Sequence, residues 1–185
     1  MVNNKTRRLA LFLALLSASI IRCASADADL FVKASRNDDN EVGAVHLGVR
    51  FPWQPDWEFL KSPRLDVAIE ASLGHWVGRR SDLPASSLND LSVVPVFRFY
   101  PDGRDAGVYF FEAGIGAHLL SRTAIDEGRR FSTALQFGDM VGVGWRPNPP
   151  SHWELGLRVE HVSNADIKKP NDGVTFYQLR VQAPL

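Results

Sequence analysis

Residues 64–78 read RLDVAIEASLGHWVG, and this stretch decides the fold. From Leu65 to Val77 every second residue lies on one face, which is apolar apart from His75. The opposite face carries Asp66, Glu70, several small residues and a tryptophan. Successive side chains of a β-strand point to opposite sides, so a period of two over this length predicts one long strand with a single apolar face.

The same alternation returns in seven further segments, which are separated by turn residues. No helical period of comparable length occurs between them. The sequence therefore predicts an all-β domain of eight antiparallel strands. The other seven segments are 28–36, 42–52, 91–100, 107–120, 132–146, 152–163 and 174–184.

Eight such strands fit two architectures. A soluble sandwich or lipocalin-like barrel turns its apolar face inward, whereas a membrane barrel turns that face to lipid. The segments match the about 9–11 residues of a tilted transmembrane strand. Their polar faces combine glycine, serine and charges of both signs, which suits a small barrel filled with side chains and without an open channel. The charged residues are Glu70, Arg98, Glu112, Glu154, Arg158 and Arg180.

Aromatic residues gather near the strand ends, as they do at the two interfaces of a membrane. These features together favour an eight-stranded antiparallel transmembrane β-barrel with a packed polar interior. One residue does not fit: Asp139 falls on the apolar face of its segment, which indicates either a β-bulge or a functional carboxylate near the lipid. The aromatic residues are Trp53, Trp57, Trp76, Phe97, Phe99, Tyr100, Tyr109, Trp145 and Trp153.

The first 26 residues have the pattern of a secretory signal peptide. Basic residues between positions 5 and 8 precede an apolar run at 9–21, and Ala24-Ser25-Ala26 is a cleavage site of small residues. The run is shorter than the about 20 residues that a spanning helix needs. We predict a signal peptide at 1–26, removed on secretion, and a barrel domain at 27–185 in the outer membrane of a Gram-negative bacterium.

Composition argues against several other classes. Cleavage after Ala26 removes Cys23, the only cysteine, and with it any disulfide or thiol nucleophile. The whole chain has 21 basic and 21 acidic residues, and the signal peptide holds four basic residues and no acidic ones, so 17 basic and 21 acidic residues are left. This acidic balance argues against a nucleic-acid partner. The histidines show no ligand spacing, and the sequence indicates no metal and no cofactor.

Loop lengths predict which end of the barrel faces outward. Bacterial barrels have short periplasmic turns and longer outer loops. With the N-terminus in the periplasm, the connections at 53–63, 101–106 and 147–151 are periplasmic, and the polar loops at 79–90 and 121–131 lie outside. The strand at 152–163 then ends at the outer surface.

His161 and Ser163 lie at that end and continue the apolar face of Leu157 and Val159, which predicts that both point toward lipid. A hydroxyl is a weak nucleophile unless a neighbouring base takes its proton, and histidine serves as such a base near neutral pH. A pair at this place suits the ester bonds of an outer-leaflet lipid better than a water-soluble substrate. The alternative is that both are polar interfacial residues at a strand end.

The longer string around this pair resembles the signature of the lipid A 3-O-deacylase (PagL-type) family of Gram-negative outer membranes. The shared residues are His161-Val162-Ser163-Asn164-Ala165, Ile167 and Pro170-Asn171-Asp172-Gly173, with weaker resemblance at 95–97, 111–116 and 183–185. The resemblance implies an outer-membrane barrel that hydrolyses the ester-linked acyl chain at the 3 position of lipid A. It also implies that Ser163 is the nucleophile and His161 its base.

The sequence departs from the family pattern at Thr175, where the resemblance implies a glutamate as the third member of the triad. A threonine hydroxyl can accept a hydrogen bond from the imidazole, but it cannot stabilise the imidazolium as a carboxylate does. In serine hydrolases, loss of that acid costs roughly 10⁴-fold in turnover. Asp172, Asp166 and Asp139 are other candidates for this role, and Asp172 is the nearest in sequence.

Other polar residues are candidates for binding the substrate. Oxyanion donors are the Asn164 or Asn171 side chain, or backbone N–H groups near Gly173, although asparagine also favours turns. Basic residues at the outer rim could bind the phosphates of lipid A. They are Lys168, Lys169, Arg129 and Arg130, together with Arg79, Arg80 and Arg122.

The sequence leaves three functions open. The first is a serine esterase acting on lipid A or lipopolysaccharide. The second, favoured by Thr175, is a catalytically weak or inactive barrel that binds lipopolysaccharide or has a structural role. The third, a small adhesin, would require more extensive loops than these. The acyl-chain preference and association as a homodimer are also left open.

Overall fold

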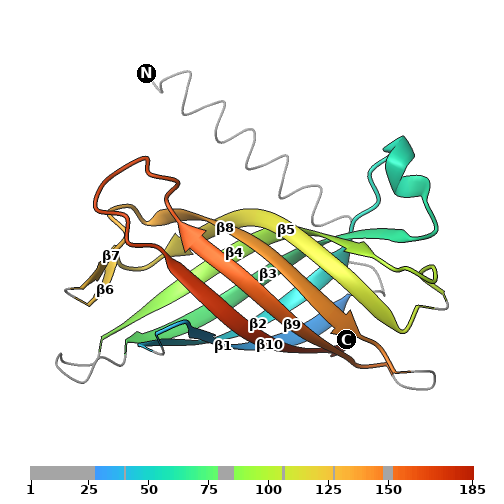
Figure 1. The fold of residues 1–185 in the computed structure, drawn as a ribbon, viewed down its shortest axis with the longest axis horizontal. Coiled ribbons are helices and arrows are strands. Elements are labelled where there is room, and N and C mark those ends of the chain that lie inside the picture. Colours follow the sequence, from blue (N-terminus) through green and yellow to red (C-terminus); the bar gives the residue numbers. More distant parts are fainter. Residues whose placement is uncertain (1–27, 40, 79–85, 106, 127, 148–151) are drawn as a thin grey trace.

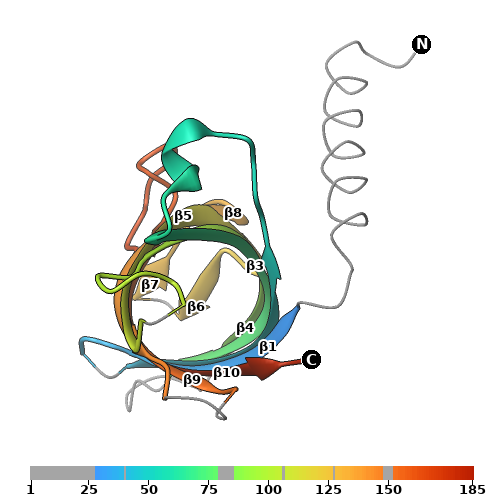
Figure 2. The ribbon, with the colours of Figure 1, turned by 90° about the vertical axis from the view of Figure 1, so that its right-hand side faces the viewer.

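The structure, a computed structural model, describes residues 28–39, 41–78, 86–105, 107–126, 128–147 and 152–185. The signal peptide expected at 1–26 lies outside the described residues. Eight antiparallel strands close into a barrel in the order β1-β10-β9-β8-β5-β4-β3-β2 (Figures 1 and 2). They are β1 (Asp29–Asn37), β2 (Val42–Pro52), β3 (Leu65–Gly78), β4 (Ser87–Phe99), β5 (Tyr109–Leu120), β8 (Leu135–Trp145), β9 (Glu154–Ser163) and β10 (Val174–Pro184). The eight predicted strands and the barrel are thus confirmed.

The wall of the barrel is apolar outside and polar inside. Leu73 and Ile115 on the outward faces are 68% and 64% exposed, whereas the inward-facing Glu70 and Arg98 are 3% and 1% exposed. This is the reverse of a soluble barrel, because the large apolar side chains cover the outside. Among the described residues no helix is long and apolar enough to cross a membrane.

Ion pairs fill the middle of the barrel. Arg158 donates to Glu70 at 2.7 and 2.9 Å and to Glu112 at 2.6 and 3.0 Å. Arg98 donates to Glu112 at 3.0 Å, and Arg180 donates to Glu70 at 2.9 Å. Each carboxylate therefore meets two guanidinium groups, and this pairing offsets the cost of burying the charges.

We expect Arg158→Leu to lower the free energy of unfolding by about 3–5 kcal/mol, because removing one partner of a buried pair leaves uncompensated charge. The measurement is denaturant unfolding of the barrel in lipid vesicles. Lys61→Ala is the matched control, because Lys61 bonds Glu58 at 2.8 Å with both side chains largely exposed, and such pairs contribute about 0–1 kcal/mol. Equal losses for the two variants would contradict the expectation.

The two ends of the barrel carry different connections between the strands. We call the end with the loop 164–173 and the small hairpin β6 (Ala124–Asp126) and β7 (Arg129–Arg130) the hairpin end. The opposite end, which we call the terminal end, carries the C-terminus and the 3-10 helix η1 (Glu58–Lys61), which stands outside the ring of strands (Figure 2).

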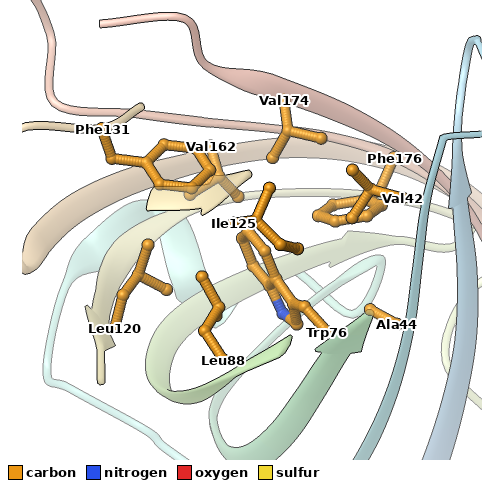
Figure 3. Packing of buried hydrophobic residues seen from close by; sticks show 10 residues of the cluster. All are labelled: Val42, Ala44, Trp76, Leu88, Leu120, Ile125, Phe131, Val162, Val174 and Phe176. Atoms are coloured by element: carbon orange, nitrogen blue, oxygen red, sulfur yellow. The ribbon is translucent and has the colours of Figure 1, made fainter. Parts of the chain in front are cut away.

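An apolar cluster fills the barrel at the hairpin end (Figure 3). Trp76 lies at its centre, with its ring centroid 4.8 Å from that of Phe176 and 6.1 Å from that of Phe131. Ile125 of β6 and Phe131, directly after β7, enter the cluster from the hairpin, which therefore covers the mouth of the barrel. The other members are Val42, Ala44, Leu88, Leu120, Val162 and Val174.

Three local features differ from the sequence expectation. The segment 53–63, expected as a turn, contains η1, and the loop expected at 121–131 contains the hairpin β6–β7. Strand β4 begins at Ser87 and not at residue 91. In the first residues of this strand the polarity of the two faces is inverted, because Leu88 is buried in the apolar cluster while Asn89 faces outward and bonds His75 Nδ1 at 2.9 Å.

Candidate functional site

His161 and Ser163 lie at the end of β9 on the outside of the barrel. Both are half-buried, whereas the residues that alternate with them, Glu160, Val162 and Asn164, are buried inside. Val162 packs in the apolar cluster, so the strand segment between the two polar residues is held from within.

Thr175 of β10 faces His161 directly across the two strands. His161 Nδ1 and Thr175 Oγ1 are 2.9 Å apart, at hydrogen-bonding distance. If Nδ1 carries the proton, it donates to the hydroxyl, and Nε2 keeps its lone pair. An imidazole held in this tautomer can accept a proton at Nε2.

Gly173 lies against both members of the pair. A Cβ added to Gly173 would be 3.0 Å from His161 Cε1, 3.3 Å from His161 Nε2 and 3.5 Å from Ser163 Cβ. Its φ of 55° is also in the left-handed region that favours glycine. A side chain here would crowd the Cε1–Nε2 edge of the imidazole and would contact Ser163 Cβ. Ser163 Oγ itself makes no hydrogen bond to His161 among the described residues, and catalytic hydrogen bonds often close only with substrate bound.

The two asparagines hold the loop 164–173 in place. Asn164 donates both of its amide hydrogens to backbone carbonyls, to Phe131 at 2.8 Å and to Lys168 at 2.7 Å. Asn171 accepts from the backbone N–H of Asn164 at 3.1 Å and donates to Asp166 at 3.0 Å. Both amide hydrogens of Asn164 and one of Asn171 are therefore used within the loop and its support.

The hairpin anchors the other half of this loop. The backbone N–H of Arg130 donates to the Asp172 carboxylate at 2.6 Å, and the Asp172 N–H donates to the Arg130 carbonyl at 3.1 Å. The Arg129 guanidinium donates to the Gly173 carbonyl at 3.2 Å and to Asp39 at 2.7 Å. The support was not predicted from the sequence, although Ile125 and Phe131 are large apolar residues in a mostly polar loop and could have indicated it.

The basic candidates for phosphate binding gather at the hairpin end, but they differ in their surroundings. Lys168 and Arg130 are exposed. Arg129 is engaged by Gly173 and Asp39, and Lys169 forms an exposed ion pair with Asp166 at 2.8 Å. That hydrogen bond from Lys169, followed by the one from Asn171, holds the pKa of the Asp166 carboxyl below its ordinary value. Arg79 and Arg80 lie outside the described residues.

The three aspartates considered for the triad have different surroundings in the structure. Asp166 and Asp172 are engaged within the loop and with the hairpin. Asp139 of β8 is instead the direct cross-strand neighbour of His161, on the side opposite Thr175. Its side chain is exposed on the outer face, and the register of β8 is unbroken with both β5 and β9. The bulge that the sequence left open at Asp139 is therefore absent.

A groove on the outer wall begins two residues from Thr175. It has a volume of about 520 Å³. Its lining includes Tyr177 and Leu179 of β10, which continue the outward face of Thr175. Outward-facing residues of the neighbouring strands complete it: Ala34, Val45 and Val77, with the polar Arg36 and His75. An elongated apolar group could lie in such a groove.

The fold and the site together define a class of protein: a transmembrane β-barrel that carries an imidazole and a hydroxyl side by side on its outer face. Within that class the chain belongs to the lipid A 3-O-deacylase (PagL) family, whose sequence model matches residues 43–184. The family that the motif resembled is thereby confirmed.

Two relatives are both named lipid A deacylase PagL. The protein from Bordetella bronchiseptica is 37% identical over 116 residues, which cover 63% of this chain and 61% of the relative. The protein from Pseudomonas aeruginosa is 31% identical over 179 residues, which cover 96% of both chains. These names support a deacylase, which is a hydrolase.

A solved structure gives the same fold. The crystal structure of the outer membrane enzyme PagL superposes with a TM-score of 0.64 at 26% identity, over 85% of this chain and 99% of that one. The family and this structure point to the outer membrane of a Gram-negative bacterium as the location of the barrel.

Proposed function

We propose that the protein is an esterase that removes the ester-linked 3-O acyl chain of lipid A, with Ser163 as nucleophile and His161 as general base. Membership of the lipid A 3-O-deacylase family supports the reaction. The observation that carries the assignment of residues is the outward-facing pair at the end of β9, with Nδ1 of His161 at hydrogen-bonding distance from Thr175.

In the first half of the proposed reaction, Ser163 Oγ attacks the ester carbonyl carbon while His161 Nε2 takes the hydroxyl proton. The tetrahedral intermediate then collapses, the bond to the 3-oxygen of lipid A breaks, and the imidazolium returns the proton to that oxygen. In the second half, His161 takes a proton from water, the resulting hydroxide attacks the acyl-Ser163 ester, and the fatty acid leaves as Ser163 recovers its proton.

The backbone N–H of Gly173 is the proposed oxyanion donor, because the N–H of Asp172 already donates to the Arg130 carbonyl. The backbone of Gly173 lies beside both His161 and Ser163, whereas the side-chain amides of Asn164 and Asn171 donate within the loop and to its support. The asparagines thus contribute by fixing the turn that presents this donor. Thr175 keeps the imidazole in its orientation and supplies no charge.

The proposed substrate reaches the site from the lipid phase. An outward-facing catalytic pair on an apolar wall suits an acyl ester that stays in the membrane, and the groove beside Thr175 suits an acyl chain. The hairpin end faces outside in this proposal, so that exposed Lys168 and Arg130 can meet the phosphates of outer-leaflet lipid A. The signal peptide at 1–26 directs secretion to the outer membrane.

A second candidate is a barrel that binds lipopolysaccharide with little or no catalysis. The observation that favours it is the hydroxyl of Thr175 at the place where the family pattern has a carboxylate. The two candidates differ in whether acyl chains leave lipid A in the presence of folded protein. A homodimer stays an untested expectation.

The test is mass spectrometry of lipid A from Gram-negative cells that express the protein. We expect a new species that lacks one 3-hydroxyacyl chain, because the proposed reaction releases that chain alone. Folding is verified by the difference in electrophoretic mobility between unheated and heated samples. A folded protein that leaves lipid A unchanged, both in cells and in detergent micelles, would sink the proposal and favour the binding role.

A further inference from the structure

Asp139 is a charged residue on the apolar outer wall. Its neighbours along the same face of β8, Phe137 and Val141, are 38% and 61% exposed, as lipid-facing residues of a barrel are. A carboxylate on this face is unfavourable unless a function retains it. No hydrogen bond or ion pair engages the Asp139 carboxylate within the part of the chain that the structure describes.

The position of Asp139 is defined by the register on both sides. It pairs with Ile115 of β5 and with His161 of β9, in ladders without a shift. Directly opposed residues have their Cβ atoms about 4.5–5.5 Å apart. The imidazole of His161 therefore stands between a hydroxyl on β10 and a carboxylate on β8.

We propose that Asp139 is a positioning residue that supplies the negative charge missing at Thr175. This inference rests on the proposed function. When the proton of Ser163 moves to His161, the ring becomes an imidazolium, and a carboxylate on the adjacent strand stabilises that charge. Surroundings of low dielectric constant strengthen such an interaction relative to water. Thr175 orients the ring through Nδ1, and Asp139 acts on the ring without touching the substrate.

The other nearby carboxylates do not offer this charge. Asp172 accepts a hydrogen bond from the backbone of Arg130, and Asp166 is paired with Lys169 and Asn171 in the exposed loop. Glu160, which precedes His161, points into the barrel and lies 3.7 Å from Lys33. Of the carboxylates considered, only Asp139 shares the outer face and the row of His161.

The experiment compares kcat and KM of purified variants on lipid A in mixed micelles. Asp139→Asn is expected to lower kcat by about 10- to 100-fold with KM unchanged, less than the roughly 10⁴-fold loss known for a directly bonded acid. Asp139→Glu keeps the charge and is expected to stay within about 5-fold of the wild type. Ile115→Asn is the matched control, because it puts the same amide in the same row one strand farther from His161, and it should leave kcat unchanged.

A second carboxylate separates a charge effect from a packing effect. In a Thr175→Glu background, Asp139→Asn is expected to lower kcat by less than about 3-fold, because the new glutamate already compensates the imidazolium. A structural role would give the same loss in both backgrounds.

Each outcome decides the matter. The role of Asp139 would be overturned if Asp139→Asn changed KM and not kcat, or if its kcat fell no more than that of Ile115→Asn. It would also be overturned if Asp139→Asn lowered kcat equally in the Thr175→Glu background. In those cases a wild-type enzyme that needs Ser163 still supports the proposed function. If neither the wild type nor Thr175→Glu releases an acyl chain, the proposed function fails, and the role of Asp139 fails with it.

Discussion

Ser163→Ala is expected to abolish release of the 3-O acyl chain, with a fall in kcat of at least about 10⁴-fold. The physical reason is that the methyl group cannot form the acyl-enzyme, so that only uncatalysed attack by water is left. His161→Ala should cost nearly as much, and the double variant should be no worse than either single one, because nucleophile and base act as a unit. The measurement is fatty-acid release from lipid A by the purified, folded barrel.

Ser87→Ala is the matched control for this loss. Ser87 is a half-buried serine at the start of β4, where it faces Val77 across the strands and lies far from β9 in the strand order. The same loss of a hydroxyl there should leave kcat within about 2-fold of the wild type, as expected for a surface change away from the site. If Ser163→Ala retained a tenth or more of the activity, another group would have to be the nucleophile.

The sequence predicts the wall of this barrel well, because a strand with one lipid face and one interior face alternates with period two. The prediction is poorest where that contrast is lost. At the start of β4 an apolar residue, Leu88, points inward, because the hairpin end of the barrel is filled with apolar side chains. The strand was therefore expected to begin four residues later than it does, at residue 91 and not at Ser87.

The hairpin β6–β7 was missed for a related reason. Its strands are only three and two residues long, too short to show a period. What stabilises it is burial of Ile125 and Phe131 in the barrel mouth, a tertiary contact that a local pattern does not contain. Its role in holding the loop 164–173 could not be predicted from the sequence either, because Asp172 and Arg130 are distant in the chain.

For the site, the alternation predicts which face of the barrel wall a residue is on. It does not predict which residues of the adjacent strands lie beside it. Alternation alone puts His161, Thr175 and Asp139 on the outer face of their strands. Which of them are neighbours depends on the stagger between strands, and the alternation within each strand does not define this stagger. The register shows that the imidazole has Thr175 on one side and Asp139 on the other. Nearness in sequence had instead favoured Asp172.

Thr175→Glu is expected to raise kcat by about 100-fold. The hydroxyl of Thr175 already lies 2.9 Å from His161 Nδ1, so a carboxylate on the same strand position can accept the same hydrogen bond and add a full negative charge beside the developing imidazolium. The roughly 10⁴-fold effect of such an acid in serine hydrolases sets the upper limit. A gain below that limit is expected here, because Asp139 supplies part of the charge in the wild type.

Thr175→Gln separates charge from size, because glutamine has the length of glutamate and can accept the hydrogen bond without a charge. We expect it to stay within about 3-fold of the wild type, and Ser163→Ala should remain inactive in the Thr175→Glu background. Equal gains for the Glu and Gln variants would mean that reach limits the wild type and not charge. No gain from the glutamate, in a barrel that still folds, would mean that the third position does not limit catalysis in this chain.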